Sequence, residues 1–290
     1  METDMLLLGV PKKGRLYQKC TDILKGIGVD YVRKARTDVA YCKTLPIKIV
    51  FLPAKDIATF VGEGNVDLGI TGEDMVAETL SCVDVITRLG FGNCKLCVQT
   101  PVGKVTDVKS IVGKRVATSF PNLTRKFFGE LAGNSSKEDA VVIRYVTGSV
   151  EAACTLGLAD AVVDLVETGT TMRAAGLEAI ADVFETEAVM VGNPNSSHKD
   201  LIKKLKARVE GYLAAKKYTM VYYNIANSKM DEACKITPGR RAPTIMPLAD
   251  SAFTSISAMV KKSEAGTVMD KLADIGATDI FIVDIANCRV

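Results

Sequence analysis

The strongest constraint on the fold is an alternation of short apolar runs with helical patterns over about the first 200 residues. Most runs lead through Gly, Ser, Thr or Pro into a segment of helical periodicity. This order predicts an α/β fold of parallel sheets flanked by helices, with ligands at the carboxyl ends of the strands. The expected strands cover residues 6–10, 47–52, 67–71, 114–120, 140–146 and 160–166.

The segment 89–103, LGFGNCKLCVQTPVG, holds two apolar runs with no helix between them. Such a segment suits strands that pass from one lobe to another, with EAVMVGN at 187–193 as the return strand. A hairpin within a single sheet is an equally good interpretation. If the segment is a hinge, lobe I covers residues 1–97 and 184–216, lobe II covers residues 98–183, and a cleft lies between the lobes.

The order of the expected strands and helices changes after a helix pattern at residues 199–217. The rest of the chain has the order strand, helix, strand, strand, helix, strand over about 70 residues, which is typical of a ferredoxin-like βαββαβ module. We therefore expect a third domain at residues 217–290. A module that follows a complete two-lobed body is more often regulatory or assembling than catalytic.

Composition excludes several classes of protein. The 290 residues are 48% hydrophobic but contain no apolar run of about 18 residues, so no membrane span is expected. The start, METDMLLLGV, carries two acids and too short an apolar run for a signal peptide, which predicts a cytoplasmic protein. The formal charge of +3 does not indicate a nucleic-acid partner.

The cysteines and the one histidine do not indicate a metal or redox site. Eight cysteines without regular spacing are expected to be reduced. Cys94 and Cys97 form a lone CxxC in a strand, and a four-sulfur zinc site needs a second pair. His198 stands in a polar segment that we expect to open the following helix, so no histidine-dependent catalysis is predicted.

The stretch DAVVDLVETGTTMRAAG, residues 160–176, is the most specific functional pattern. Asp164 is expected at the end of a buried strand, where its carboxylate can accept from the hydroxyls of a ribose, and Glu167 follows it. The next loop and the helix dipole can hold a 5′-phosphate, and a glycine permits close approach. The backbone donors are those of Thr168, Gly169, Thr170 and Thr171. Simple helix capping by a threonine is the alternative.

Two further loops follow expected strands. VPKKGRL places Lys12, Lys13 and Arg15 after the first strand, and GEGNVDLGITGEDM places Asp74 where a strand turns into a helix. Solvated turn chemistry explains each loop about equally well.

Six segments together resemble a known family: PKKGRLY, VGEGNVDLGITGED, FGNCKL, GSVEAACTLGLADAVVDLVETGTTMRAAGL, TPGRRAPTI and NCRV. From near residue 5 to the end, the chain resembles the long, self-regulated form of ATP phosphoribosyltransferase, and most of all its fungal-type eukaryotic branch. The resemblance implies a two-lobed, periplasmic-binding-protein-like catalytic body followed by an ACT-like domain.

The implied reaction is the first step of histidine biosynthesis. Adenine N1 of ATP would take the phosphoribosyl group of phosphoribosyl pyrophosphate, and pyrophosphate would leave with the help of Mg²⁺. Because the N1 lone pair is free at neutral pH, positioning and charge stabilisation suffice without a general base. The resemblance also implies inhibition by histidine and dimers that assemble into a hexamer.

The resemblance also implies roles for single residues. Lys12 and Arg15 would meet phosphates and act in catalysis with Asp164, while Asp74 and Phe120 would face adenine. Core packing explains Phe120 equally well.

The resemblance also carries expectations for the segment at residues 53–55 and for the C-terminal module. Where some bacterial relatives carry an arginine, this chain has Pro53 and Ala54, so only Lys55 offers a charge to ATP in that loop. The implied histidine-binding residues of the C-terminal module are Asn224, Ala242, Thr244 and Asp279.

Two other functions fit the same two-lobed pattern. A solute-binding protein would close on a small molecule without turning it over, although a signal sequence would then be expected. A phosphoribosyltransferase for a free base would have no use for the residues that face ATP.

Overall fold

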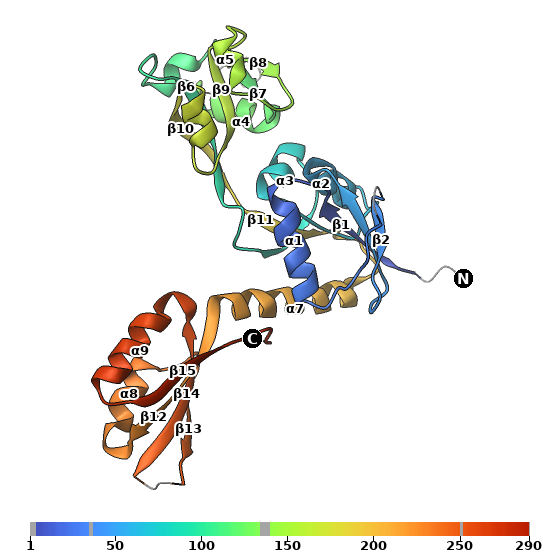
Figure 1. The fold of residues 1–290 in the computed structure, drawn as a ribbon. Coiled ribbons are helices and arrows are strands. Elements are labelled where there is room, and N and C mark those ends of the chain that lie inside the picture. Colours follow the sequence, from blue (N-terminus) through green and yellow to red (C-terminus); the bar gives the residue numbers. More distant parts are fainter. Residues whose placement is uncertain (1–3, 35–36, 134–139, 250–251, 290) are drawn as a thin grey trace. The chain divides into compact units, whose positions relative to one another are not determined.

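The computed structural model describes residues 4–34, 37–133, 140–249 and 252–289. Its strands form three sheets of six, five and four strands (Figure 1). The chain divides into two compact units, of which the second comprises residues 22–29 and 203–290. The first two sheets lie in the first unit, and the third sheet lies in the second.

The first sheet has the strand order β2-β3-β1-β4-β11-β5. Its centre, β3-β1-β4, is parallel, whereas β2, β11 and β5 pair antiparallel with their neighbours, so the prediction of a parallel sheet is wrong at the edges. The elements of this lobe are β1 (Leu6–Pro11), α1 (Arg15–Gly26), β2 (Val39–Tyr41), β3 (Ile47–Leu52), α2 (Ala54–Gly62), β4 (Leu68–Gly72), α3 (Glu73–Thr79), β5 (Asp84–Arg88) and β11 (Ala188–Gly192).

The second sheet has the order β10-β6-β9-β7-β8. Strands β8, β7 and β9 are parallel, while β6 runs antiparallel to both β9 and β10. Its elements are β6 (Cys94–Pro101), η1 (Val108–Ile111), β7 (Arg115–Thr118), α4 (Pro121–Leu131), β8 (Val142–Tyr145), α5 (Ala152–Thr155), β9 (Ala161–Val166), α6 (Thr170–Ala174) and β10 (Leu177–Thr186).

The chain crosses between these sheets twice, as the sequence predicted. Strand β5 belongs to the first sheet and β6 to the second, while β10 belongs to the second and β11 to the first. The two crossovers are confirmed, and the hairpin interpretation of the first is wrong. The expected lobe boundaries fall inside strands, since residues 97 and 184 both lie within strands of the second sheet.

A buried carboxylate joins the two lobes away from the crossovers. Glu78 on α3 is 2% exposed, and its two oxygens accept from the N–H groups of Asn122 and Leu123, each at 3.0 Å. These donors belong to the first turn of α4, whose own helix cannot satisfy them. Glu78 therefore caps a helix of lobe II from lobe I.

The second unit confirms the βαββαβ order. Its sheet runs β13-β14-β12-β15, and α8 and α9 cover one face of it (Figure 1). The long helix α7 begins directly after His198, and from residue 203 onward it belongs to this unit. The elements are α7 (Lys199–Lys217), β12 (Tyr218–Ala226), η2 (Asn227–Lys229), α8 (Met230–Ile236), β13 (Thr244–Pro247), β14 (Phe253–Lys261), η3 (Lys262–Glu264), α9 (Ala265–Asp274) and β15 (Thr278–Asp284).

The last residues are held by hydrogen bonds within the second unit. The amide of Asn287 donates to the carbonyl of Gly26 at 2.8 Å, and a Cβ at Gly211 on α7 would lie 1.9 Å from the carbonyl oxygen of Cys288. A glycine on α7 thus lets the C-terminal segment pass closely. Across the described residues, no helix combines the length and apolarity that a membrane crossing requires.

The ion pair between Arg115 and Asp160 predicts a pH-dependent stability of lobe II. The side chain and backbone N–H of Arg115 donate to Asp160 and hold the pKa of this carboxyl at about 2, below the usual value near 3.9. Because the folded-state pKa is the lower one, the stabilisation is present above about pH 4 and is lost as the pH falls towards 2.

We expect Asp160→Asn to lower the free energy of unfolding at pH 6 by about 1 kcal/mol or less, since the pair is partly exposed. The difference from the wild type should shrink between pH 4 and pH 2, measured as urea-unfolding midpoints. Arg115→Gln should weaken the same pH dependence, because the guanidinium is lost while the backbone N–H still donates to Asp160. A difference that stays constant down to pH 2 would contradict this account.

Candidate functional site

Residues from both lobes and from the crossover segments line a cavity of about 280 Å³, called here the Asp74 cavity. It lies where β1 and β4 of lobe I end and where β9 of lobe II ends. That position agrees with ligand binding at the carboxyl ends of strands. Its lining consists of Pro11, Lys13, Leu16, Lys19, Ala54, Gly72, Asp74, Phe91, Gly92, Cys94, Leu165, Glu167, Thr186, Glu187 and Ala188.

Asp74 gives the cavity a buried acceptor. It lies in the first turn of α3, where the helix dipole favours a carboxylate, and is 5% exposed. Thr186, the last residue of β10, contacts both its backbone and its carboxylate. Apolar side chains of Leu16, Phe91 and Leu165 line the same space. A flat ring with an amino group fits this combination.

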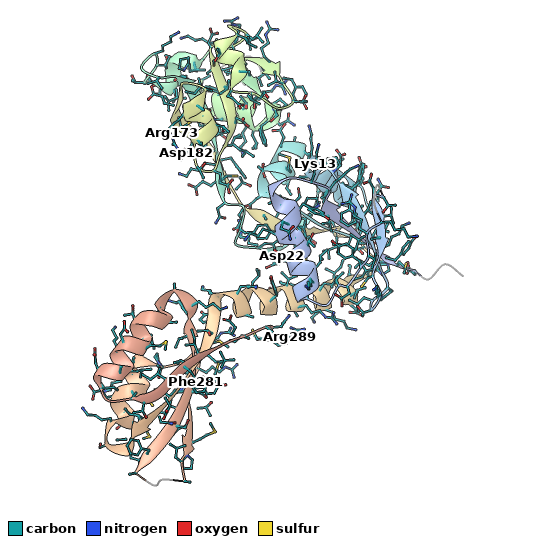
Figure 2. The ribbon with its side chains drawn as sticks, viewed as in Figure 1. Lys13, Asp22, Arg173, Asp182, Phe281 and Arg289 are labelled. Atoms are coloured by element: carbon teal, nitrogen blue, oxygen red, sulfur yellow. The ribbon has the colours of Figure 1, made fainter. Side chains whose placement is uncertain are left out.

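The basic residues after β1 have different surroundings in the structure. Lys13, labelled in Figure 2, lines the Asp74 cavity together with Lys19 of α1. Lys12 instead forms an ion pair with Asp38 at 2.7 Å, and this hydrogen bond lowers the pKa of the Asp38 carboxyl. Arg15 is the first residue of α1, and its side chain lies outside the described part of the chain.

The loop at residues 167–171 has the strand–loop–helix form that the sequence predicted. Gly169 has a left-handed φ of 72°, is buried, and precedes a short helix, α6. The guanidinium of Arg173 donates to the carbonyl of Thr168 at 2.9 Å, and the hydroxyls of Thr168 and Thr170 are 3.0 Å apart. Arg173 thus brings a positive charge to the exposed loop (Figure 2).

Asp164 lies within β9 rather than at its end, because the strand continues to Val166. Its half-buried carboxylate accepts from the N–H of Leu165 at 2.8 Å. Among the described residues from 164 to 171, Leu165 and Glu167 line the Asp74 cavity. Val166 and Glu167 line a second cavity beside it. Of the loop at residues 167–171, Glu167 lines the Asp74 cavity, whereas residues 168–171 are not part of its lining.

Lys55 and Phe120 have different surroundings. The ammonium of Lys55, on α2, lies 5.9 Å from the ring centroid of Tyr145 in lobe II. Phe120 is 3% exposed and packs in the core of the second sheet, which agrees with the packing interpretation.

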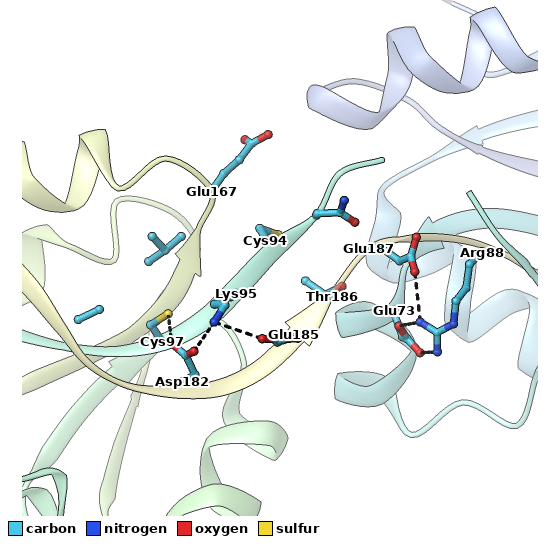
Figure 3. Close-up of a pocket in the computed structure, with 13 residues that line it drawn as sticks. Glu73, Arg88, Cys94, Lys95, Cys97, Glu167, Asp182, Glu185, Thr186 and Glu187 are labelled. Carbon is cyan, nitrogen blue, oxygen red and sulfur yellow. Dashed lines mark hydrogen bonds and ion pairs between the residues drawn. The ribbon is translucent and has the colours of Figure 1, made fainter. Parts of the chain in front are cut away.

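A second, acidic cavity of about 580 Å³ adjoins the first and is called here the Arg88 cavity. It shares Cys94, Glu167, Thr186 and Glu187 with the Asp74 cavity. Arg88 donates to both oxygens of Glu73 at 2.6 Å and also pairs with Glu187 (Figure 3). Those two carboxylates raise the pKa of the Arg88 guanidinium.

The same close-up places Cys97 beside Asp182 and Lys95 (Figure 3). Burial, with the neighbouring Asp182 carboxylate, raises the pKa of the Cys97 thiol to about 12. This cysteine is therefore a neutral thiol at physiological pH, not a nucleophile. The described residues include no group of three or more His, Cys, Asp or Glu side chains that could hold a metal ion.

The four expected histidine-binding residues form two groups in the second unit. Ala242 and Thr244 line a cavity of about 590 Å³ together with Arg240, Arg241 and Arg289. Elsewhere the amide of Asn224 donates to the carboxylate of Asp279 at 2.9 Å.

The register relates these two groups. Thr244 pairs with Ser257, and Ser257 pairs with Tyr222, two residues before Asn224 on β12. Thr244 and Asn224 therefore lie on one face of the sheet. Val221 and Tyr223, which alternate with Tyr222, point into the core under the helices, so that face is the one away from α8 and α9.

Sequence reasoning missed several residues of the Asp74 cavity. Lys19 lies one helical turn beyond Arg15 and could have been found from helical spacing. Phe91 and Gly92 lie in the crossover, and Thr186 ends β10, so their approach to Asp74 depends on strand pairing over a long sequence separation.

Comparison with known proteins identifies the family. The family model described as HisG, ATP phosphoribosyltransferase, matches residues 53–211, and the model of the HisG C-terminal domain matches residues 215–287. ATP phosphoribosyltransferases of Yarrowia lipolytica and Saccharomyces cerevisiae are 49% and 47% identical, each over 99% of this chain and over 97% and 98% of their own lengths.

A solved structure agrees with these matches. The ATP phosphoribosyl transferase (HisG:HisZ) complex from Thermotoga maritima contains a chain that is 28% identical, with a TM-score of 0.60, covering 71% of this chain and 99% of that chain. With relatives nearly half identical over the full length, this chain belongs to the ATP phosphoribosyltransferase family.

Proposed function

We infer that this chain transfers the phosphoribosyl group of phosphoribosyl pyrophosphate to adenine N1 of ATP and releases pyrophosphate, the first step of histidine biosynthesis. The full-length similarity to named ATP phosphoribosyltransferases carries this conclusion. The bond from N1 to the anomeric carbon forms as the bond from that carbon to pyrophosphate breaks, and the pyrophosphate leaves with the electron pair. No proton transfer is required of the protein.

The Asp74 cavity is the proposed ATP site. Leu16, Phe91 and Leu165 supply apolar surface for the purine ring, and Asp74 supplies an acceptor for its amino group. Lys13 and Lys19 supply positive charge for the triphosphate. A cavity that pairs a purine acceptor with two lysines favours ATP over a free base.

The loop at 168–171 is the proposed site of the 5′-phosphate of the second substrate. The backbone N–H groups there, with Gly169 allowing close approach, and the guanidinium of Arg173 suit a dianion. Asp164 and Glu167 are the acidic residues that directly precede this loop in the chain. They would hold the ribose hydroxyls and stabilise the cationic sugar of the transition state.

Lys12, Arg15 and Lys55 are proposed to meet the outer phosphates or the departing pyrophosphate. Lys12 would have to exchange its contact with Asp38 for a phosphate oxygen. Among the described residues there is no group of three or more His, Cys, Asp or Glu side chains that could hold a metal ion. Mg²⁺ is proposed to arrive bound to substrate phosphates, where it neutralises the leaving group.

The second unit is proposed to bind histidine as an inhibitor. The arginines beside Thr244 suit its carboxylate, and Asp279, which holds Asn224, supplies the charge for its ammonium that an amide lacks. Assembly of dimers into a hexamer is proposed with it.

The decisive experiment incubates the purified protein with ATP, Mg²⁺ and phosphoribosyl pyrophosphate and follows the ultraviolet change of an N1-substituted adenine. Binding of either substrate without turnover would favour a solute-binding protein. Turnover with free adenine in place of ATP would favour a free-base phosphoribosyltransferase.

Gly169→Val should lower turnover at least tenfold while the fold survives. A Cβ at this position would lie 2.7 Å from a guanidinium nitrogen of Arg173, so this cation must move away from the loop, and the left-handed φ of 72° is strained for valine. Gly176→Val is the matched control, because Gly176 also has a left-handed φ but no atom within 4 Å of the added Cβ. Equal turnover in the two variants would remove the loop from the proposed site.

Thr244→Val should keep turnover without histidine near the wild-type level and raise the inhibitory concentration of histidine roughly tenfold or more, through loss of one hydrogen bond to a charged ligand. Thr267→Val, an equally exposed change on α9, should leave inhibition unaltered. The assignment fails if histidine inhibits Thr244→Val as strongly as the wild type.

A further inference from the structure

The antiparallel pairing of β4 with β11 continues beyond the two strands and ends on a side chain. The N–H of Glu73 donates to the carbonyl of Glu187 at 2.9 Å. At the next position the N–H of Asp74 donates to the hydroxyl oxygen of Thr186 at 3.0 Å. This N–H lies in the first turn of α3, which offers it no intrahelical acceptor, so the threonine hydroxyl satisfies it.

The same hydroxyl also holds the carboxylate of Asp74. A hydroxyl has one proton and two lone pairs, and the N–H of Asp74 occupies a lone pair because it can only donate. The hydroxyl proton of Thr186 therefore goes to Oδ1 of Asp74, at 3.0 Å. The residues are 5% and 6% exposed, so water cannot readily replace either bond.

Gly72 completes this arrangement. A Cβ on Gly72 would lie 2.0 Å from Oδ1 of Asp74. Its φ of −83° is ordinary, so the glycine is required for space and not for backbone freedom. The carboxylate folds back over Gly72 and is fixed there by Thr186. Its orientation is thus set by two residues from different strands.

The orientation of the Asp74 carboxylate suits the 6-amino group of adenine, a match that rests on the proposed function. N1 must face the ribosyl carbon, so the 6-amino group is the donor on that edge that a carboxylate can bind without blocking attack. As the N1 bond forms, the ring gains positive charge that the 6-amino group shares. A carboxylate at this group therefore binds the transition state more strongly than ATP itself.

We propose that Thr186 is a positioning residue that orients the Asp74 carboxylate towards the 6-amino group of the purine, and that this pair sets the preference of the enzyme for a 6-aminopurine nucleotide. In this proposal Thr186 acts on the purine through Asp74 and not through a contact of its own. Its effect passes through the hydroxyl that the backbone and carboxylate of Asp74 share.

The test compares ATP with purine riboside triphosphate, which has N1 but no 6-amino group, in the wild type, Thr186→Val and Thr186→Ser. Thr186→Val keeps the shape and loses both hydrogen bonds, so its kcat/KM for ATP should fall about tenfold or more. Its kcat/KM for the analogue should change little. The ratio of the two values should therefore collapse in Thr186→Val and be restored in Thr186→Ser.

The ratio separates positioning from a merely structural role. Damage to the fold lowers kcat/KM for both nucleotides together and leaves their ratio at the wild-type value, which would overturn the proposal. Thr186→Ser with the collapsed ratio would overturn it as well. A wild type that does not transfer phosphoribosyl to ATP would instead refute the proposed function, before any variant is compared.

Discussion

The first unit depends on the insertion of β11 between β4 and β5. All five residues of β11 are buried, and the strand pairs antiparallel with both neighbours. Because it follows the whole of lobe II in the chain, the first sheet is incomplete until the chain has left that lobe and returned. The insertion fixes where the crossovers run, and both cavities of the first unit form along them.

The Arg88 cavity and the Asp74 cavity hold their carboxylates by different contacts. Arg88 forms ion pairs with Glu73 and Glu187 at the Arg88 cavity. Asp74 lies one residue beyond Glu73, in the first turn of α3, and Thr186 holds its carboxylate. A buried carboxylate at this position suits the proposed site, because it can stabilise an adenine that becomes positive in the transition state.

Local patterns were enough to predict most elements and the strand–loop–helix form at residues 160–176. The apolar runs became strands, and Gly169 has a left-handed conformation. Strand direction at the sheet edges was not predicted, because it depends on which lobe the chain returns from. Asp38 likewise could not be foreseen as the partner of Lys12, since nothing in either loop specifies the other.

The residues missed at the site share one physical cause. Thr186 is the last residue of β10, in a sequence, FETEA, that carries no recognisable motif, and its role exists only because the return strand pairs with β4 in one register. A shift of that register by one residue would turn the Thr186 side chain to the other face of the strand and bring Glu185 or Glu187 towards Asp74. Two carboxylates would then repel each other at a buried position. The complete burial of β11 opposes such a shift, so hydrophobic packing in the first sheet is what keeps a hydroxyl, and not a second acid, beside Asp74.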